Sequence, residues 1–539
     1  MRKYLSILLA LCIAVGLTSF ATAEENPYAE KYDITWTTYI AAPLNEDAVV
    51  LKKYEEMFNV DINMLNIEDA NFLEVLNTYI AGGDTPDVIR LKDPSQLSTY
   101  IAQGVVGSFD VNLVREYMPY TSKLLDELED GAFWSMGASD GEQYGIPGIA
   151  AGNAFHLPIV YNLDWMEAIG VTETPTTLEE LETLMYKFAN EDPDGNGEKD
   201  TYGVSADGLR NLFGAYGVNP GAADGRTDHS YFQLINGEVE YAATTEQYRE
   251  ALRVAKKWYD DGVIDPEFIT GENTGGYWAI SNSFINGRIG MTVRGNYYHW
   301  VMPGMYMDID ENGEDIEIQP GNVAKELIAV NPDARIVFGQ PVEGPYGKGV
   351  KAWNMLAQFY VFSPELTEDT DRFIRALQIM DYALVRYHTE YSDAKQAWLE
   401  WAFGPEGENW YWTIKEDGSY SIRQEFADLH PDVGPSDDYG VYLQMAPTPA
   451  ERNVGRGAEF AYGLNYDKDG IINLIQFSLP KMGDYQNGIT QLKDTAMIEF
   501  ITGKRDLDKD WDAYIAELNQ AGLSEMAQEV RDWYWSNHQ

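Results

Sequence analysis

The hydrophobic and polar positions after residue 30 alternate between two spacings. Residues 33–40 are rich in β-forming side chains, and Ile34 and Trp36 share one face, which predicts a strand. Residues 45–58 place apolar side chains at helical spacing behind a capping asparagine, which predicts a helix. The alternation continues with predicted strands over 60–64 and 87–91 and predicted helices over 71–81 and 94–103. This order predicts an open α/β fold with a mostly parallel sheet and helices on both faces.

Length and composition indicate a folded protein with more than one core. The chain has 539 residues, of which 45% are hydrophobic, so it can bury enough apolar surface to offset the entropy lost on ordering. A chain of this length exceeds what a single hydrophobic core usually serves, so we expect at least two lobes.

The net charge narrows the classes of ligand. With 38 Lys and Arg against 87 Asp and Glu, the chain carries a charge of −49, which repels nucleic-acid phosphates and anionic lipid. We therefore expect no nucleic-acid partner. An anionic ligand is also disfavoured unless a basic pocket or a metal ion compensates for its charge. The 14 Trp and 36 Tyr favour a neutral ligand that stacks on aromatic rings.

Residues 1–23 have the features of a signal peptide. A basic start is followed by an apolar run and by the small residues Ala21 and Ala23 of a cleavage site. We expect an exported protein, extracellular or periplasmic and associated with the cell envelope, whose mature chain begins at Glu24. Its only cysteine, Cys12, lies inside the apolar run. We expect no lipid there, because Leu11 is bulky where a lipoprotein signal needs a small residue; the alternative is a Cys12 anchor.

Short motifs recur in a fixed order from about residue 30 to the end of the chain. They are an AGGDTPDVI run at residues 81–89, YGIP at 144–147 followed by IVYNLDW at 159–165, TPTTLEE at 174–180, INGRIGMT at 285–292, FGPEG at 403–407 and ITG at 501–503. Taken together, they resemble the extracellular solute-binding proteins of ABC importers, of the maltose and oligosaccharide type and its large Gram-positive branch. One departure is Asn162, where that branch often has a basic residue.

The resemblance implies a two-lobed fold like that of periplasmic binding proteins. Each lobe is then an α/β sheet assembled from discontinuous segments, with a hinge between them and the ligand in the crevice. It implies chain crossings near residues 148–158, 350–360 and 440–456. The expected parts are a signal peptide (1–23), the first part of the N-lobe (24–155), the first part of the C-lobe (156–350), the second part of the N-lobe (351–445) and a C-terminal segment mainly in the C-lobe (446–539).

Residues 192–203 have the spacing of an EF-hand calcium loop. Side chains with oxygen atoms occupy positions 1, 3, 5 and 9, and Gly197 occupies position 6, where the turn needs glycine. Position 12 is Gly203 instead of glutamate, and Thr201 or water could substitute. A capping box, Thr177 with Glu180, predicts the helix that enters the loop. The alternative is an Asp- and Gly-rich turn without an ion. The spacing predicts a structural Ca²⁺ held by Asp192, Asp194, Asn196, the carbonyl of Glu198, and Asp200.

Candidate sugar-binding residues lie at strand ends and near the expected crossings. Sugars stack their C–H-rich faces on aromatic rings, and their hydroxyls meet amide, carboxylate and guanidinium groups. Tyr297 occupies the place where maltose-type proteins stack a sugar on Trp, so the resemblance implies a stacking role. For each aromatic candidate the alternative is a place in the core or at its rim. The other candidates are Trp36 and Tyr39 at the first strand, Lys92 and Asp93 after the third, Arg294 beside Tyr297, Trp353 at the second crossing and Trp410 in an aromatic run.

Catalytic motifs are missing from the sequence. There is no nucleophile elbow, no zinc-binding His-Glu-x-x-His and no phosphate-binding glycine loop, and the six histidines are scattered. We therefore expect no enzyme, but a monomeric binding protein that delivers a neutral oligosaccharide to the membrane permease of an ABC importer. The alternatives are a peptide or another small solute as ligand and, as a different class, a secreted carbohydrate-active enzyme. The sequence does not name the linkage or length of the sugar.

Overall fold

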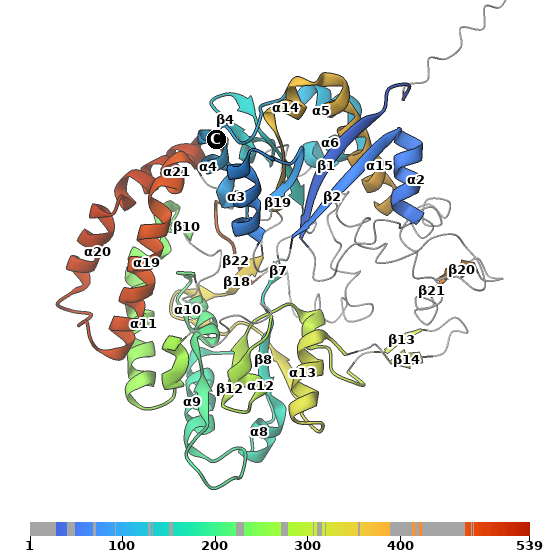
Figure 1. Cartoon of the computed structure of the whole chain (residues 1–539). Coiled ribbons are helices and arrows are strands. Elements are labelled where there is room, and N and C mark those ends of the chain that lie inside the picture. Colours follow the sequence, from blue (N-terminus) through green and yellow to red (C-terminus); the bar gives the residue numbers. More distant parts are fainter. Residues whose placement is uncertain are drawn as a thin grey trace, which may run out of the picture.

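Two mixed sheets joined by short crossing strands form the framework of the protein (Figure 1). The computed structural model describes residues 28–39, 49–67, 72–91, 93–127, 131, 133–149, 155–221, 231–270, 279–305, 307–309, 315–317, 320–353, 356–388, 412–414, 420–422, 469–475, 477 and 479–538.

The first lobe is built on a five-stranded sheet in the order β2-β1-β3-β19-β6. β1 is parallel to β2 and β3, as predicted, whereas β19 runs antiparallel to both β3 and β6. Ile34 and Trp36 are both fully buried in β1, as their spacing predicts. The strands are β1 (Tyr32–Tyr39), β2 (Val60–Ile67), β3 (Val88–Leu91), β6 (Gly145–Ile149) and β19 (Leu356–Phe362), and a small hairpin pairs β4 (Ala138–Ser139) with β5 (Glu142–Gln143).

The helices of the first lobe follow the predicted alternation. The helix predicted over 94–103 begins as a 3-10 turn, η2 (Pro94–Gln96), because Asp93 accepts a hydrogen bond from the backbone N–H of Ser95, and continues as α4 (Leu97–Ala102). The other helices of this lobe are α2 (Val49–Phe58), α3 (Phe72–Gly82), α5 (Val111–Tyr117), α6 (Pro119–Glu127), α7 (Phe133–Met136), α14 (Pro364–Glu368) and α15 (Thr370–His388).

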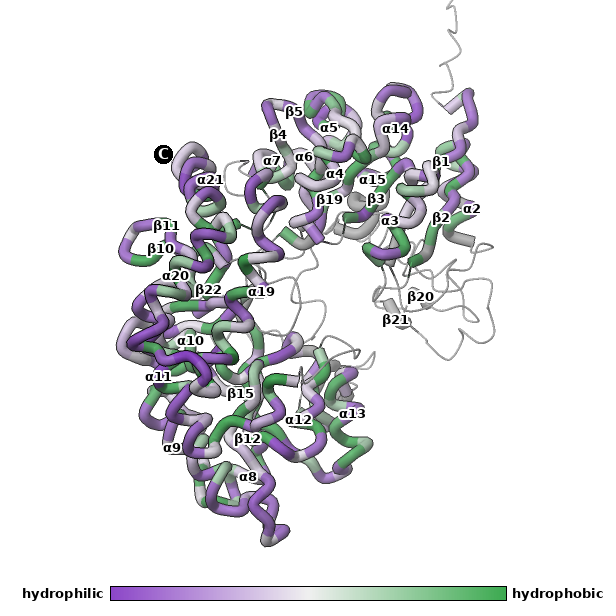
Figure 2. The backbone as a smooth tube through the Cα atoms, turned by 60° about the vertical axis from the view of Figure 1, so that its left-hand side comes forward, coloured by the Kyte–Doolittle hydropathy of each residue, from purple (hydrophilic) through white to green (hydrophobic). Residues whose placement is uncertain are grey.

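The second lobe is built on a four-stranded sheet in the order β15-β8-β12-β9. β12 is parallel to β9, and β8 runs antiparallel to its two neighbours. In Figure 2, β12 is largely hydrophobic, whereas the outer helices α9 and α11 carry many hydrophilic positions. The strands are β8 (Ile159–Asn162), β9 (Tyr202–Val204), β12 (Ile289–Val293) and β15 (Ile336–Gly339), and the helices are α8 (Leu163–Ala168), α9 (Leu178–Asn190), α10 (Leu209–Ala215), α11 (Glu246–Asp260), α12 (Asn282–Ile285) and α13 (Asn322–Val330).

Short strands carry the chain between the lobes. After β6 the chain passes through β7 (Phe155–His156) into β8, and it returns through β18 (Val350–Trp353) into β19. β7 and β18 pair antiparallel, and β18 also pairs with β22 (Gly470–Ile471). The remaining elements are the hairpins β10 (Phe232–Ile235) with β11 (Glu238–Tyr241), β13 (Met307–Ile309) with β14 (Asp315–Glu317), β16 (Glu343–Gly344) with β17 (Gly347–Lys348) and β20 (Trp412–Ile414) with β21 (Tyr420–Ile422), and the 3-10 turns η4 (Ala206–Gly208), η5 (Ala242–Thr244), η6 (Pro266–Thr270) and η7 (Tyr297–Trp300).

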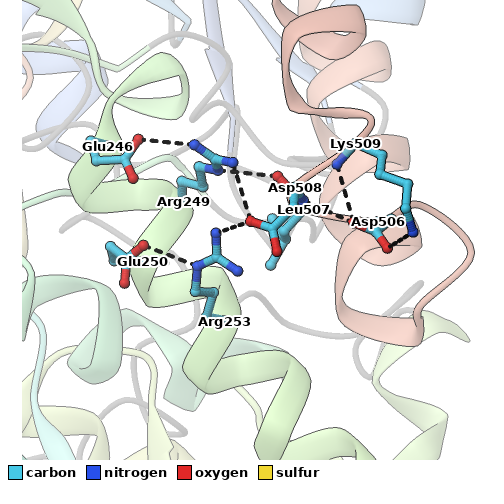
Figure 3. A network of polar contacts seen from close by, with 8 residues as sticks. All are labelled: Glu246, Arg249, Glu250, Arg253, Asp506, Leu507, Asp508 and Lys509. Atoms are coloured by element: carbon cyan, nitrogen blue, oxygen red, sulfur yellow. Dashed lines mark hydrogen bonds and ion pairs between the residues drawn. The ribbon is translucent and has the colours of Figure 1, made fainter.

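Three C-terminal helices, α19 (Pro480–Thr502), α20 (Trp511–Gln520) and α21 (Leu523–Asn537), pack mainly on the second lobe. α19 lies against α11, and the turn before α20 is tied to α11 by ion pairs (Figure 3). In that turn, Asp508 accepts hydrogen bonds from both Arg249 and Arg253, and Arg249 also donates to the carbonyl of Leu507 at 3.1 Å. These contacts are partly exposed, so they fix the position of the helices more than they add stability.

The predicted two-lobed α/β fold class is confirmed, and both sheets are mixed because the strands next to the crossings run antiparallel to their neighbours. The residue limits of the lobes remain predictions. The signal peptide at 1–23 and the third crossing, expected at 440–456, lie outside the described residues. In the part of the chain that the structure describes, no helix is both long and apolar enough to span a bilayer.

An ion pair of the buried Asp87 explains one of the two acidic residues in the motif at residues 81–89. Asp87 is buried and accepts hydrogen bonds from the N–H and the hydroxyl of Thr35, both at 2.8 Å, and from Arg372 of α15. It therefore joins β1, the start of β3 and α15. Removing one partner of such a pair leaves a buried charge without compensation.

We expect Asp87→Ala to lower the free energy of unfolding by about 3 kcal/mol, because the guanidinium of Arg372, whose side chain is only 18% exposed, then loses its carboxylate partner. Urea denaturation at low and high salt measures the change. Asp508→Ala, in the exposed network of Figure 3, is the control, and its effect should be small and should disappear at high salt. Equal effects of the two substitutions would contradict this account.

Candidate functional site

The carboxyl ends of the strands in the two sheets face each other. In the first sheet β1, β2, β3 and β6 end at one edge, and β19 begins there. In the second sheet β9, β12 and β15 end at the edge where β8 begins. The chain passes between these two edges through β7 and, after the β16–β17 hairpin, through β18, so each edge is turned toward the other lobe (Figure 1). Ligands of open α/β sheets bind beyond this edge, which makes it the candidate site.

Three buried charged side chains meet at the edge of the second sheet. Asp207, in the turn after β9, accepts a hydrogen bond from Nη1 of Arg294 at 2.6 Å and another from Arg210 of α10. Arg210 also donates to the carbonyl of Val293, the last residue of β12, at 3.0 Å. The side chains of Arg294 and Asp207 are only 4% and 2% exposed, so their charges depend on this pairing. Guanidinium groups held in this way are oriented donors for hydroxyl or carboxylate oxygens.

The turn after Arg294 is held by its own hydrogen bonds. The indole N–H of Trp300 donates to the carbonyl of Arg294 at 2.7 Å, and the N–H of Asn296 donates to Nδ1 of His299 at 2.9 Å. Burial lowers the pKa of His299 to about 3, so the ring is neutral at neutral pH and Nδ1 is free of a proton, as an acceptor requires.

Tyr297 lies in the same turn but faces the core. Its ring is 3% exposed and lies 4.8 Å, between centroids, from the ring of Phe338 in β15. In this position neither face of the Tyr297 ring is accessible to a sugar. Stacking of a ligand on this ring stays a prediction, and it requires the ring to move away from Phe338.

The edge of the first sheet carries a second buried polar group. Nε of Arg90, in β3, donates to the side-chain oxygen of Gln358 in β19 at 2.7 Å. The backbone N–H of Arg90 donates to the hydroxyl of Thr37 in β1 at 3.1 Å. Gln358 occupies the space beside Gly148 of β6, where an added Cβ would lie 2.6 Å from the glutamine Cγ. Arg90, Gln358 and Thr37 therefore fix one guanidinium near the ends of β1 and β3.

The other predicted site residues are placed as follows. Trp36 is fully buried, so the contact predicted between its ring and a ligand would require its neighbours to move. Asp93 is 8% exposed and accepts from the N–H of Ser95 at 3.0 Å, so it acts first as the cap of η2. Among the candidate residues that the structure describes, Arg294 and Tyr297 lie together, between the end of β12 and the start of η7. The side chains of Tyr39, Lys92, Trp353 and Trp410 lie outside the described residues.

The sequence reasoning missed four polar residues at these edges. Arg90 stands inside an apolar strand and Gln358 inside an apolar run, and a polar side chain in such a run is the signal that could have found them. Asp207 and Arg210 follow β9 directly, at the place where the ends of parallel strands converge. The pairing of Asp207 with Arg294 depends on a contact across 87 residues of chain.

The predicted calcium loop has several features of an EF-hand. Gly197 has a positive φ of 81°, and its N–H donates to Oδ2 of Asp192 at 3.1 Å, which closes the turn at position 6. The side-chain nitrogen of Asn196 donates to Asp194 at 2.8 Å and to both oxygens of Asp200 at 3.3 Å. The loop side chains thus converge on an amide group. Nowhere among the described residues do three or more acidic, His or Cys side chains stand close enough to hold an ion.

The end of the loop is a strand instead of a second helix, as expected from its sequence. An added Cβ on Gly203, at position 12, would lie 2.9 Å from the Cβ and the carbonyl of Met185, so no carboxylate fits there. The hydroxyl of Thr201 donates to the carbonyl of Phe188 at 2.9 Å, which turns it toward α9 and away from the loop. Water is therefore the better substitute for the missing ligand.

Acidic side chains lie close to one another in this loop. Burial raises the pKa of Asp194, and so do the hydrogen bond that its protonated form donates to Asp192 and the charges of Asp200 and Asp192, although the N–H of Asn196 opposes the shift. A raised pKa means that the ionised loop is destabilised in the folded protein, which is the situation that a bound cation relieves.

Comparisons with known proteins agree with this fold. The model of the bacterial extracellular solute-binding protein family matches residues 50–363, more than half of the chain. The chain is 28% identical over 260 residues to the fructooligosaccharide ABC transporter substrate-binding protein FusA of Streptococcus pneumoniae, covering 45% of this chain and 46% of the relative. It is 24% identical over 280 residues to the polygalacturonan/rhamnogalacturonan-binding protein YtcQ of Bacillus subtilis, covering 50% and 53%. The chain thus spans about half the length of the curated relatives it matches.

A solved structure has the same fold over almost the whole length. The structure of an EF-hand mutant of S. pneumoniae FusA in complex with fructo-nystose has a TM-score of 0.61 and 19% identity, and the match covers 94% of this chain and 99% of that one. The solved structure shows the fold alone, and the family match shows that the chain belongs to the bacterial extracellular solute-binding proteins.

Proposed function

We propose that this protein is the substrate-binding component of an ABC importer, which captures an oligosaccharide between its lobes and delivers it to a membrane permease. The observation that carries the proposal is the pair of facing sheet edges, each holding a fixed guanidinium, with Arg90 on one side and Arg294 on the other. FusA, whose name describes a fructooligosaccharide-binding component of such a transporter, supports the class of ligand.

The proposed role is capture without catalysis. A ligand that touches both edges gains contacts only when the lobes close, so binding favours the closed state, and a permease that recognises closure senses occupancy. β7 and β18 are the strands about which closure takes place in this proposal. The described groups at the two edges, Arg90, Gln358, Arg210, Asp207 and Arg294, are hydrogen-bonding groups that orient one another, which suits binding.

Two features of opposite charge bear on the chemistry of the ligand: the acidic chain as a whole and the guanidinium groups at the two edges. The net charge of −49 favours a neutral oligosaccharide, which is the ligand we propose. The guanidinium groups at both edges also suit the carboxylate of an acidic sugar, and YtcQ is named as a binder of polygalacturonan. An acidic oligosaccharide is therefore the second candidate. A peptide is the third, and the described residues offer no particular support for it.

The remaining parts of the proposal concern the form of the protein. We propose a monomer that works outside the cell membrane after removal of residues 1–23, without lipid at Cys12 and without a nucleic-acid partner. The apolar run and the cleavage signal at Ala21 and Ala23 support the first part, and the net charge supports the last.

We also propose a structural Ca²⁺ in the loop of residues 192–200. A cation would replace the amide nitrogen of Asn196 between Asp194 and Asp200, and a rotation of that amide would turn its oxygen toward the ion. The glycine turn at Gly197 supports this role, and so does the raised pKa of Asp194. The carbonyl of Glu198 would supply a further oxygen ligand. The ion would hold the connection between α9 and β9 in place.

If the function is correct, a neutral oligosaccharide raises the melting temperature of the purified protein. At a ligand concentration of 100 times Kd the gain in stability is about 2.7 kcal/mol. The measurement is a thermal-shift screen over neutral oligosaccharides, oligogalacturonides and peptides, followed by calorimetry. Glucose and free galacturonic acid are the matched controls, because each is a single sugar unit and offers fewer groups to two facing edges than an oligosaccharide does. A shift with peptides alone would contradict an oligosaccharide ligand, and a glycan cleaved during incubation would contradict a role without catalysis.

If calcium binds, a chelator lowers the melting temperature and added Ca²⁺ restores it. Asp194→Ala should remove this sensitivity, because it deletes the carboxylate at position 3 of the loop. Asp84→Ala, which changes an exposed carboxylate elsewhere, should keep it. The chelator effect should also weaken as the pH falls toward the raised pKa of Asp194, because protons then compete with the ion. Identical melting curves with and without chelator would count against the site.

A further inference from the structure

Helix α10 touches both the candidate ligand site and the strand that crosses between the lobes. All seven of its residues are buried. At its start, Arg210 binds Asp207 and the carbonyl of Val293 at the edge of the second sheet. At its end, it packs on the segment that leaves the second lobe through the β16–β17 hairpin and enters β18. The side-chain oxygen of Asn211 also accepts a hydrogen bond from the N–H of Val342, which starts this segment, at 3.3 Å.

The end of α10 approaches the outgoing segment so closely that only glycine fits. An added Cβ on Gly214 would lie 1.7 Å from the carbonyl oxygen of Gly349, the residue before β18. An added Cβ on Gly344 would lie 2.3 Å from the carbonyl oxygen of Ala215. Both obstacles are backbone atoms, which have no rotamer to change. We name this contact, formed by Gly214, Gly344 and Gly349, the glycine seam.

Gly349, at one end of the glycine seam, lies next to the crossing strands β7 and β18, about which the proposed closure takes place. Gly349 precedes β18, and an added Cβ there would lie 2.8 Å from a side-chain carbon of Ile471 in β22. β18 pairs with β7, and the N–H of Leu157 donates to the carbonyl of Lys351 at 2.9 Å. Only Val350 and Lys351 therefore separate Gly349 from Ala352, the first residue of β18 that pairs with β7. A displacement of α10 by a fraction of an ångström is transmitted to these strands, because close-packed backbone does not absorb it.

We propose that Gly214 and Gly349 are positioning residues that couple the guanidinium of Arg210 to the crossing strand β18. A ligand that draws Arg210 and Asp207 toward it then moves α10 against the hinge, so occupancy of the second lobe biases the angle between the lobes. The part of the inference that concerns the ligand rests on the proposed function. The part that concerns the seam does not, because it predicts the lobe angle of the ligand-free protein.

The test compares Gly214→Ala with Gly488→Ala. Both glycines lie inside helices, but nothing lies within 4 Å of a Cβ built on Gly488, so that substitution is the matched control. A pair of labels reports the lobe separation, one at Lys123→Cys in the first lobe and one at Val330→Cys in the second; these side chains are exposed. The chain has one natural cysteine, Cys12, in the expected signal peptide, so a chain starting at Glu24 can be labelled at these two positions alone.

We expect Gly214→Ala to shift the distribution of distances between the labels in the ligand-free protein. We also expect it to change the Kd for the oligosaccharide found in the thermal-shift screen, on the order of tenfold. Gly488→Ala should change neither quantity. The Cβ added by Gly349→Ala presses mainly on the flexible side chain of Ile471 and lies 3.2 Å from the carbonyl oxygen of Asp469, so this is the milder variant and decides the question if Gly214→Ala does not fold.

A merely structural seam would give a different result. The seam variants would then lower the melting temperature while the label distances stay those of the parent protein, and that outcome overturns the proposal. If the parent binds no oligosaccharide, the proposed function fails, but the distances in the ligand-free variants still test the seam.

Discussion

The antiparallel pairing of β7 with β18 is the constraint on which the rest of the architecture depends. These strands are so short that the two sheets can be joined only edge to edge, with the carboxyl ends of their parallel strands turned toward each other. Among the described residues, the polar groups Arg90, Asp207 and Arg294 lie at those edges. The same strands form a narrow connection, which is what a hinge requires. The short paired strands β7 and β18 therefore account both for the facing positions of the binding groups and for the proposed closure of the lobes.

Buried arginine side chains lie at both sheet edges, although the chain as a whole is strongly acidic. A protein with a net charge of −49 has buried guanidinium groups at both edges of its candidate site, from Arg90 in the first lobe and from Arg210 and Arg294 in the second. Burying these groups is tolerated because each is held by an oriented acceptor, Gln358 or Asp207. The net charge describes what the protein repels at a distance, whereas the local geometry decides what it binds.

The C-terminal helices add a second connection of a different kind. They are tied to α11 by Asp508 and its two arginine partners, so they belong mechanically to the second lobe, and α19 also reaches α4 of the first lobe. The glycine seam lies on another side of the same lobe, where α10 meets β18. α19 thus contacts the first lobe away from β7 and β18, and the close backbone contact of α10 lies beside β18, so the positions of both helices matter for closure.

Local spacing in the sequence determined the elements of this protein. Alternation placed Ile34 and Trp36 on the buried face of β1, the capping box set the start of α9, and Gly197 marked the turn of the acidic loop, because each signal involves neighbours within a few residues. It also predicted the parallel order of β1, β2 and β3. Only the tertiary structure decided which side chains form the site: Arg90 meets Gln358 across 268 residues of chain, and Tyr297, predicted to stack on a sugar, packs on Phe338 instead. Burial and charge pairing depend on which strands become neighbours, and no local pattern contains that information.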